Sequence, residues 1–273
     1  MLLSLMAAHG ISTACRPNEC TRGIAMEDYY MAMTEVARPN KLDGLQTLSP
    51  TEAGGLPVPR GSRLRVGDTI VGGPVVHGIV TAAEGPAYVS DLLERVGLEA
   101  GYRLRFPHQF SGGMRQRAMI AMALSCNPQL LIADEPTTAL DVTVQAQILA
   151  LFTHLRDEFG AALLYVTHDL AVVAQLCDSL TVLYSGKVME SRQDLQAALA
   201  DPRHPYTRAL LQSTPDVDRI EQRLRTIPGN APSPSDRPDG CPFAPRCDRV
   251  EDDCRSGSIP DMSTTPDVVV HCR

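Results

Sequence analysis

Two acidic side chains and one imidazole follow two apolar runs, at positions from which they could act on a phosphate. Asp134 and Glu135 come directly after the run 130–133, and His168 follows the run 162–166. Asp134 could hold Mg²⁺ through water, Glu135 could polarise the water that attacks a γ-phosphate, and His168 could contact that phosphate. For any one of these residues considered alone, a solvated acid pair or a satisfied strand-end histidine is the better explanation. The order of the features therefore carries the prediction.

A glycine turn precedes the first of these runs. Ser111, Gly112 and Gly113 lead into a segment, 114–125, that is rich in Ala, Met and Arg. This pattern is typical of a loop that enters a helix, and backbone N–H groups at such a helix start can bind an anionic oxygen. An ordinary glycine turn is the alternative interpretation.

The elements that must position these residues alternate between strands and helices. The runs 130–133 and 162–166 read as buried strands, and Asp141 is a good N-cap for a helix that Gly160 ends. Further helices are expected over about 88–96, 114–125 and 170–176, and a hairpin over 180–190. Such alternation predicts an α/β fold that binds its ligand at the carboxyl ends of the strands.

Composition limits the class of protein. The 273 residues are 44% hydrophobic and 21% charged, as in a soluble globular chain. A net charge of -7, with no basic block, argues against a nucleic-acid partner. No apolar stretch approaches the roughly 18 residues of a spanning helix, and the opening run 1–8 lacks the positive flank of a secretory signal. We therefore expect a cytosolic chain that reaches a membrane only through a partner.

Four motifs in this order resemble those of the ABC transporter ATPases. Residues 110–117 (FSGGMRQR) resemble the ABC signature, 130–135 the Walker B motif, 139–141 the D-loop and His168 the switch histidine. Their order and spacing are highly specific. The resemblance implies a P-loop NTPase-like ABC nucleotide-binding domain that uses ATP and Mg²⁺.

Two further stretches resemble the dipeptide, oligopeptide and nickel importer branch of that family. They are 134–143 (DEPTTALDVT) and 203–207 (RHPYT), the latter at the start of a C-terminal extension. The resemblance implies an ATPase subunit on the cytoplasmic face of the membrane, which couples ATP hydrolysis to import of di- or oligopeptides. Nickel cargo stays open.

The same resemblance assigns residues and partners. Glu135 and His168 are the expected catalytic residues and Asp134 the expected Mg²⁺ residue. The expected nucleotide contacts are Ser111, Gly112, Gly113, Met114, Gln116 and Asp141. The expected partners are a second ATP-binding subunit in a homo- or heterodimer, two membrane permease subunits and, indirectly, a periplasmic or extracellular substrate-binding protein.

One family motif has no counterpart in this sequence. Residues 1–110 contain no G-x-x-x-x-G-K-[ST] loop to cradle phosphates. We interpret 1–63 as a poorly ordered or unrelated leader, with at most short helices such as one around 27–36. On this interpretation 64–200 is a partial ABC domain, 201–273 is the extension, and the strand that ends at His168 has an unpaired edge.

The missing loop leaves the chain's own ATPase activity uncertain. One alternative is a non-catalytic interaction subunit, or the product of a degraded gene, that supplies only the signature to a partner. A DNA-repair or translation ATPase with the same motifs is a third possibility. The segment 203–207 and the acidic charge argue against that third possibility.

Four cysteines gather in the last 33 residues: Cys241, Cys247, Cys254 and Cys272. A small proline-rich module lacks the core to fold without a staple, and four thiolates suit zinc or an iron–sulfur cluster. The spacing is not that of a zinc ribbon, and the resemblance to the importer branch implies a [4Fe-4S] cluster. Thiols without a metal are the alternative.

Overall fold

The computed structural model describes residues 31–36, 45–48, 64–138, 140–214, 226–233, 236–260, 262–263 and 265–272. The chain divides into two compact units, which are described separately. We call residues 37–164 the helical unit, and residues 1–36 with 165–273 the sheet unit. Strand β4 (Ala162–Thr167) passes from the first into the second.

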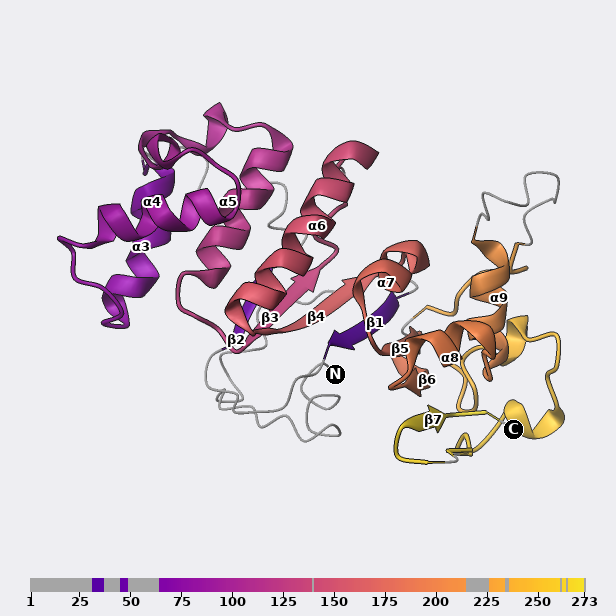
Figure 1. Cartoon of the computed structure of the whole chain (residues 1–273). Helices are drawn as coiled ribbons and strands as arrows, with labels where there is room; N and C mark the ends of the chain where they lie inside the picture. The colour runs from indigo at the N-terminus through magenta and orange to yellow at the C-terminus, as the bar shows by residue number, and fades with distance from the viewer. Residues whose placement is uncertain are drawn as a thin grey trace. The chain divides into compact units, whose positions relative to one another are not determined.

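The helical unit holds four described helices, two parallel strands and the start of β4 (Figure 1). Strand β2 (Leu45–Leu48) pairs in parallel with β3 (Leu130–Asp134), and Leu45 lies opposite Leu130. The helices are α3 (Val66–Val76), α4 (Gly85–Arg95), α5 (Gly112–Leu124) and α6 (Val142–Phe159), with short 3₁₀ turns at Ala100–Leu104 and Pro107–Gln109.

Local sequence explains where these helices begin and end. The Asp141 carboxylate accepts a hydrogen bond from the Val144 backbone N–H at 2.9 Å, which caps α6. Gly160 ends that helix with a φ of 63°, a left-handed conformation that favours glycine. The predicted helix, strand and cap positions at 130–160 are confirmed.

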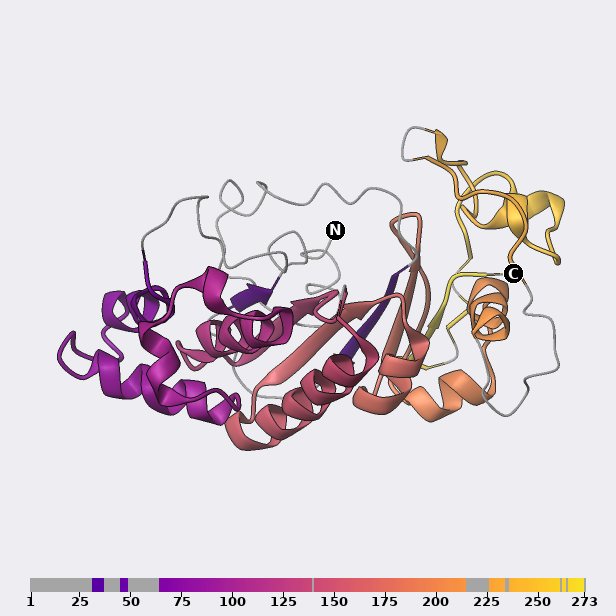
Figure 2. The same ribbon diagram turned by 90° about the horizontal axis from the view of Figure 1, so that it is seen from above.

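The sheet unit contains antiparallel strands beside the second half of β4. Their order is β4, β1 (Met31–Val36), β5 (Leu180–Tyr184), β6 (Lys187–Arg192) and β7 (Val268–Val270). Figure 2 shows β1 beside the hairpin of β5 and β6. Three helices complete the unit: α7 (Leu170–Leu176), α8 (Leu195–Ala200) and α9 (Pro205–Ser213). Two short 3₁₀ turns, Ala244–Arg246 and Asp252–Cys254, lie in residues 241–272, which carry the four C-terminal cysteines and which we call the cysteine segment.

The hairpin turn forms where the sequence predicted it. Ser185 and Gly186 have φ values of 47° and 76°, the left-handed pair that a two-residue hairpin turn requires.

Two predictions that follow from the interpretation of residues 1–63 as a leader are wrong. Met31–Val36 forms a strand rather than a helix, and it pairs with β5. This strand also lies next to β4 in the sheet order, so the strand that ends at His168 does not have the unpaired edge we predicted. A sheet edge supplies hydrogen-bond partners that local sequence cannot reveal. The other residues of 1–63, apart from β2, lie outside the described part of the chain.

No helix in the described residues combines the length and apolar character that crossing a membrane demands.

Candidate functional site

The glycine turn starts helix α5 at an exposed corner of the helical unit. Ser111 is the N-cap, and its hydroxyl oxygen accepts from the Met114 backbone N–H at 3.4 Å. Ser111 and Gly112 are exposed, whereas Gly113 and Met114 are half-buried. The first N–H groups of a helix have no partner within the helix, so this turn presents donors and the positive end of the helix dipole.

The first turn of α6 packs against this corner. A Cβ atom on Gly113 would lie 2.7 Å from Cγ1 of Val144, whereas one on Gly112 would lie 3.7 Å from Cδ2 of Leu140. Gly113 is therefore required by the close approach of α6, and Gly112 is not. The structure thus brings the signature turn together with the segment that ends at Asp141. Ala139 lies outside the described residues.

Gln116 is the predicted nucleotide contact that points inward. Its side chain is 4% exposed within α5, so it faces the interior of the helical unit. Its role toward a nucleotide stays a prediction.

Asp134 and Glu135 end strand β3 as a close pair of acids. Asp134 is half-buried, and burial, with a smaller contribution from Glu135, raises the pKa of its carboxyl to about 6. Glu135 has a φ of 48°, an uncommon conformation for a residue other than glycine. Its carboxylate accepts from the Thr138 hydroxyl at 2.7 Å. A strained, hydrogen-bonded acid after a buried strand fits a polarising role, since strained backbone gathers at functional sites.

His168 belongs to the sheet unit, where it follows the last residue of β4. It is exposed, and the next residue, Asp169, caps α7 by accepting from the Ala171 backbone N–H at 2.9 Å. The Asp169 N–H in turn donates to the Thr167 hydroxyl at 3.1 Å. These local bonds fix the backbone on both sides of His168. The predicted catalytic residues therefore fall in two separately described units, Glu135 in one and His168 in the other.

Within the sheet unit, the cysteine segment packs onto strand β5 and helix α9 through an aromatic core. The rings of Tyr184, Tyr206 and Phe243 lie 4.7 to 5.3 Å apart between centroids, and each is at most 1% exposed. Arg246 donates to the Tyr184 hydroxyl at 3.1 Å and to the Pro228 carbonyl at 2.8 Å. Aromatic burial of this kind dominates the stability of a small module.

Strand β7 brings the last cysteine back to the same module. It pairs antiparallel with β6, and the backbone N–H of His271 donates to the Met189 carbonyl at 2.9 Å. Cys272 follows directly. The pairing of β7 with β6, between residues about 80 positions apart, thus returns Cys272 to the part of the unit that holds the other three cysteines. The spacing of the cysteines in the sequence does not reveal this pairing.

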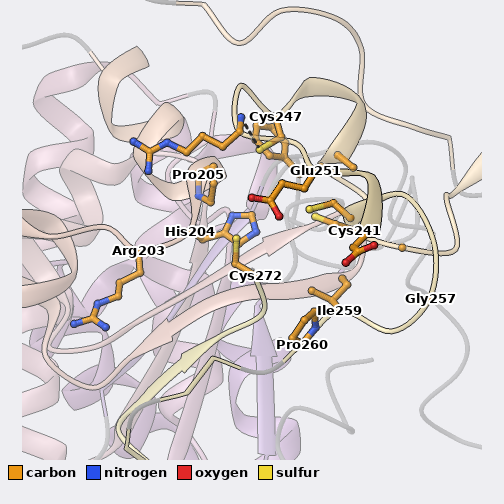
Figure 3. A pocket seen from close by; sticks show the side chains of 16 residues that line it. Arg203, His204, Pro205, Cys241, Cys247, Glu251, Gly257, Ile259, Pro260 and Cys272 are labelled. Atoms are coloured by element: carbon orange, nitrogen blue, oxygen red, sulfur yellow. Dashed lines mark hydrogen bonds between the residues drawn. The ribbon is translucent and has the colours of Figure 1, made fainter.

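All four predicted cysteines line one cavity of about 90 Å³ within the sheet unit (Figure 3). The Cys241 backbone N–H donates to the Cys254 carbonyl at 2.9 Å, and the Cys247 sulfur accepts from the Arg249 N–H at 3.4 Å. The four are thiols without disulfide bonds. Burial raises the pKa of both Cys241 and Cys247, so an empty cavity favours the protonated thiols.

The placement of side chains does not by itself form a metal site. Within the described ranges, no group of three or more His, Cys, Asp or Glu residues is arranged to hold a metal ion. The predicted iron–sulfur cluster therefore has no support from preformed coordination. The cavity is nevertheless several times larger than the roughly 10–15 Å³ that a cavity needs to hold one water, so it has room for a group of several atoms.

Sequence reasoning missed two buried residues beside this cavity. His204, which the sequence marked only as part of a family segment, is 1% exposed and lines the cavity. Burial, followed by the charge of His271, lowers its pKa to about 4. Glu190 is 0% exposed and accepts from the backbone N–H groups of Arg203 and His204 at 3.1 and 2.9 Å. A proline directly after His204 was the one available signal of a helix N-cap there.

The family models place these features in a known class. Residues 48–138 match the model described as ABC transporter. Residues 190–254 match the model described as the C-terminal region of oligopeptide/dipeptide transporters. The chain therefore carries a stretch that matches ABC transporters, followed by a stretch that matches the C-terminal region of oligopeptide/dipeptide transporters.

Curated relatives agree with this assignment. The chain is 47% identical over 195 residues to the oligopeptide transport ATP-binding protein OppD of Escherichia coli K12, covering 71% of this chain and 58% of that protein. It is 45% identical over 193 residues to the oligopeptide transport ATP-binding protein AppD of Bacillus subtilis 168, covering 70% and 58%. The chain thus spans less than two thirds of the relatives it matches.

One solved structure is also similar. It is a dimeric ATP-binding cassette in a post-hydrolysis state with ADP and Pi, 28% identical, with a TM-score of 0.42 over 50% of this chain and 57% of that one.

Proposed function

We propose that this chain acts as an ATP-binding subunit of an ABC importer for peptides and that it presents its signature turn to a nucleotide held by a partner subunit. The observation that carries the proposal is the exposed start of α5, where Ser111 and Gly112 offer a hydroxyl and backbone donors to an anion. The match to the oligopeptide/dipeptide C-terminal region and the names of the relatives favour peptide cargo.

The chain's own residues divide into two functional sets. The first set, Ser111, Gly112 and Gly113, binds the phosphate oxygens of the partner's nucleotide. The second set, Asp134, Glu135 and His168, suits a nucleotide held by this chain, where ATP with Mg²⁺ would supply the phosphoryl group. There Asp134 would hold the ion, Glu135 would orient the attacking water and His168 would contact the γ-phosphate.

The two sets differ in what they require from this chain, since only the second set needs a phosphate-binding loop in the same chain. The 273 residues contain no G-x-x-x-x-G-K-[ST] loop. Within these 273 residues, the second set therefore has no loop whose backbone N–H groups and lysine would bind the phosphates. We propose that the first set, which is exposed at Ser111 and Gly112, carries the activity and that permease subunits and a second ATP-binding subunit complete the transporter at the cytoplasmic face of the membrane.

ATP turnover in a mixture tests this proposal. A complete ATP-binding subunit of a related peptide importer, which carries its own phosphate loop, is mixed with this chain, and phosphate release is measured. We expect turnover to rise several-fold on addition of this chain and to lose that rise with Ser111→Arg, which blocks the turn with a bulky cation. Ala150→Arg places the same side chain on an exposed position of α6 and serves as the matched control.

The second set provides the contradicting outcome. If Glu135→Gln abolishes the rise while Ser111→Arg leaves it intact, hydrolysis occurs at this chain's own site and the proposal is wrong. The absence of any rise, together with binding to permease subunits, would instead favour a non-catalytic interaction protein.

We further propose that Cys241, Cys247, Cys254 and Cys272 hold a metal centre, with an iron–sulfur cluster preferred over a single zinc ion. The support is that all four line one cavity with room for several atoms, although their placement without metal does not form a site for a single ion. Four thiolates would ligate the cluster, and this cross-link would stabilise a segment that has little hydrophobic core of its own. Metal and acid-labile sulfide analysis of the anaerobically purified full chain tests this, and a Cys241→Ser, Cys254→Ser double variant is expected to lose most of both.

A further inference from the structure

His204 carries a buried ring nitrogen that has no hydrogen-bond partner. The backbone N–H of Tyr206 donates to His204 Nδ1 at 3.0 Å, so Nδ1 must be the acceptor. In a neutral imidazole the proton then sits on Nε2. Nε2 is fully buried and no group in the described part of the chain accepts from it. A buried donor without an acceptor is unfavourable, and such a group calls for an explanation.

The ring that carries this nitrogen lines the cysteine cavity. His204 lines that cavity with all four cysteines, and Figure 3 shows its ring directed into the pocket, among the side chains of Cys272, Cys241 and Glu251. An acceptor placed in the cavity would satisfy Nε2–H. Thiolate and sulfide sulfurs are such acceptors, and hydrogen bonds to sulfur are among the factors that set the properties of metal–sulfur centres.

The tautomer excludes a direct ligand role for this ring. Metal binding through Nε2 requires that nitrogen to be deprotonated, which would put the proton on Nδ1, opposite the Tyr206 N–H. Two donors would then face each other. His204 can therefore donate to a group in the cavity, but it cannot ligate a metal while it caps α9.

The fold fixes the position of this donor. The buried Glu190 carboxylate, on β6, accepts from the His204 backbone N–H at 2.9 Å, and Arg192 lies 3.5 Å from the same carboxylate. The His204 ring is thus held by the hydrogen bond from the Tyr206 N–H to Nδ1, and the His204 backbone is held by the hydrogen bond from its own N–H to Glu190. A donor held at both points is preorganised toward the cavity.

We propose that His204 is a positioning residue whose Nε2–H donates a hydrogen bond to a sulfur atom of the metal centre held by the four cysteines. This inference rests on the metal centre proposed above, and it adds a fifth residue from outside the cysteine segment. It also links that segment to the hairpin through Glu190. The interaction stabilises the centre and favours its reduced, more negative state.

Reconstitution of the full chain tests the inference. Wild-type protein and the His204→Asn variant are loaded anaerobically, in one arm with Fe²⁺ and sulfide and in a second arm with Zn²⁺ alone. Asn keeps a side-chain oxygen that can cap the Tyr206 N–H, but it is too short to donate into the cavity. We expect His204→Asn to release its metal to a chelator about 10- to 100-fold faster. In the iron arm we also expect its reduction potential to shift to a lower value.

Two control variants separate this role from a structural one. Thr207→Val removes a second buried polar group that has no hydrogen-bond partner among the described residues, the hydroxyl of a residue that does not line the cavity, and it is expected to behave as wild type. Glu251→Gln tests whether the nearby carboxylate is the true acceptor. If Glu251→Gln changes the potential as much as His204→Asn does, the acceptor is the carboxylate and the inference is overturned.

The remaining outcomes separate this inference from the proposal beneath it. If the wild type holds a metal centre and His204→Asn has the same release rate and potential, the metal centre stands and the role of His204 is refuted. If the wild type takes up neither iron with sulfide nor zinc, both fail.

Discussion

The carboxylate of Glu190 accepts a hydrogen bond from the backbone N–H of His204 at 2.9 Å, with both residues almost wholly buried. The two residues stand 14 positions apart, one on a strand and one at the start of α9. This bond joins the hairpin of β5 and β6 to the start of α9, which precedes the cysteine segment in the sequence. The stability of that junction therefore depends on one buried acid.

Glu190→Leu should destabilise the sheet unit strongly. The change leaves two buried backbone N–H groups without an acceptor and leaves Arg192, which is also buried, without its acid. Removing one partner of a buried ion pair costs about 3–5 kcal/mol. Urea unfolding followed by tyrosine fluorescence measures this, since the chain has no tryptophan.

Glu190→Gln is the matched control for that substitution. The amide keeps one oxygen that can accept from a backbone N–H, so the loss should be clearly smaller than with leucine. Equal losses for the two variants would show that the negative charge, rather than the acceptor, holds the junction.

Gly113→Ala should lower stability by about 1 kcal/mol, whereas Gly112→Ala should be neutral or slightly stabilising. Alanine is the better helix former by up to about 1 kcal/mol, but overpacking costs about 1–3 kcal/mol. Only at Gly113 would the new methyl group meet Val144, at 2.7 Å. Thermal unfolding of both variants makes the comparison.

A double variant identifies the cause of the Gly113 effect. Val144→Ala removes the methyl groups that the new Cβ would meet, so Gly113→Ala should cost less in that background. If its cost is unchanged, crowding by α6 is not the reason for the glycine.

Asp134 should make the helical unit less stable as the pH rises from about 4 to 6. Its pKa is raised from an ordinary 3.8 to about 6 in the folded chain, chiefly by burial. The stabilisation of the neutral acid is therefore fully present below pH 3.8 and is lost as the pH rises through 6. The side chain is only half-buried, and solvent screening limits the effect to about 1 kcal/mol or less.

The Asp134→Asn variant measures that effect directly. Asparagine stays neutral, so the variant should gain stability relative to the wild type between pH 4 and pH 6, and the gain should level off above that range. Urea midpoints at constant ionic strength and a series of pH values provide the measurement. A stability difference that does not change with pH would contradict the raised pKa.

Local sequence was sufficient wherever the determining interactions are local. The caps at Asp141 and Gly160, the turn at Ser185 and the apolar run before Asp134 each depend on neighbours within a few residues. Their patterns therefore predicted the elements correctly. The ABC-type motifs were recognisable for the same reason, because each is a short stretch on a single turn or strand end.

Pairings between distant segments were decided only by the tertiary structure. Whether Met31–Val36 forms a helix or a strand depends on a partner about 150 residues away, and the strand beside β5 is the result. The cysteines were visible in the sequence, but the cavity they share requires β7 to return to β6. The position of His204 beside this cavity depends on its hydrogen bond to the buried Glu190. The separation of 14 residues between the two gave no indication that they would meet. Burial and long-range hydrogen bonding set these features, and neither can be read from local residue order.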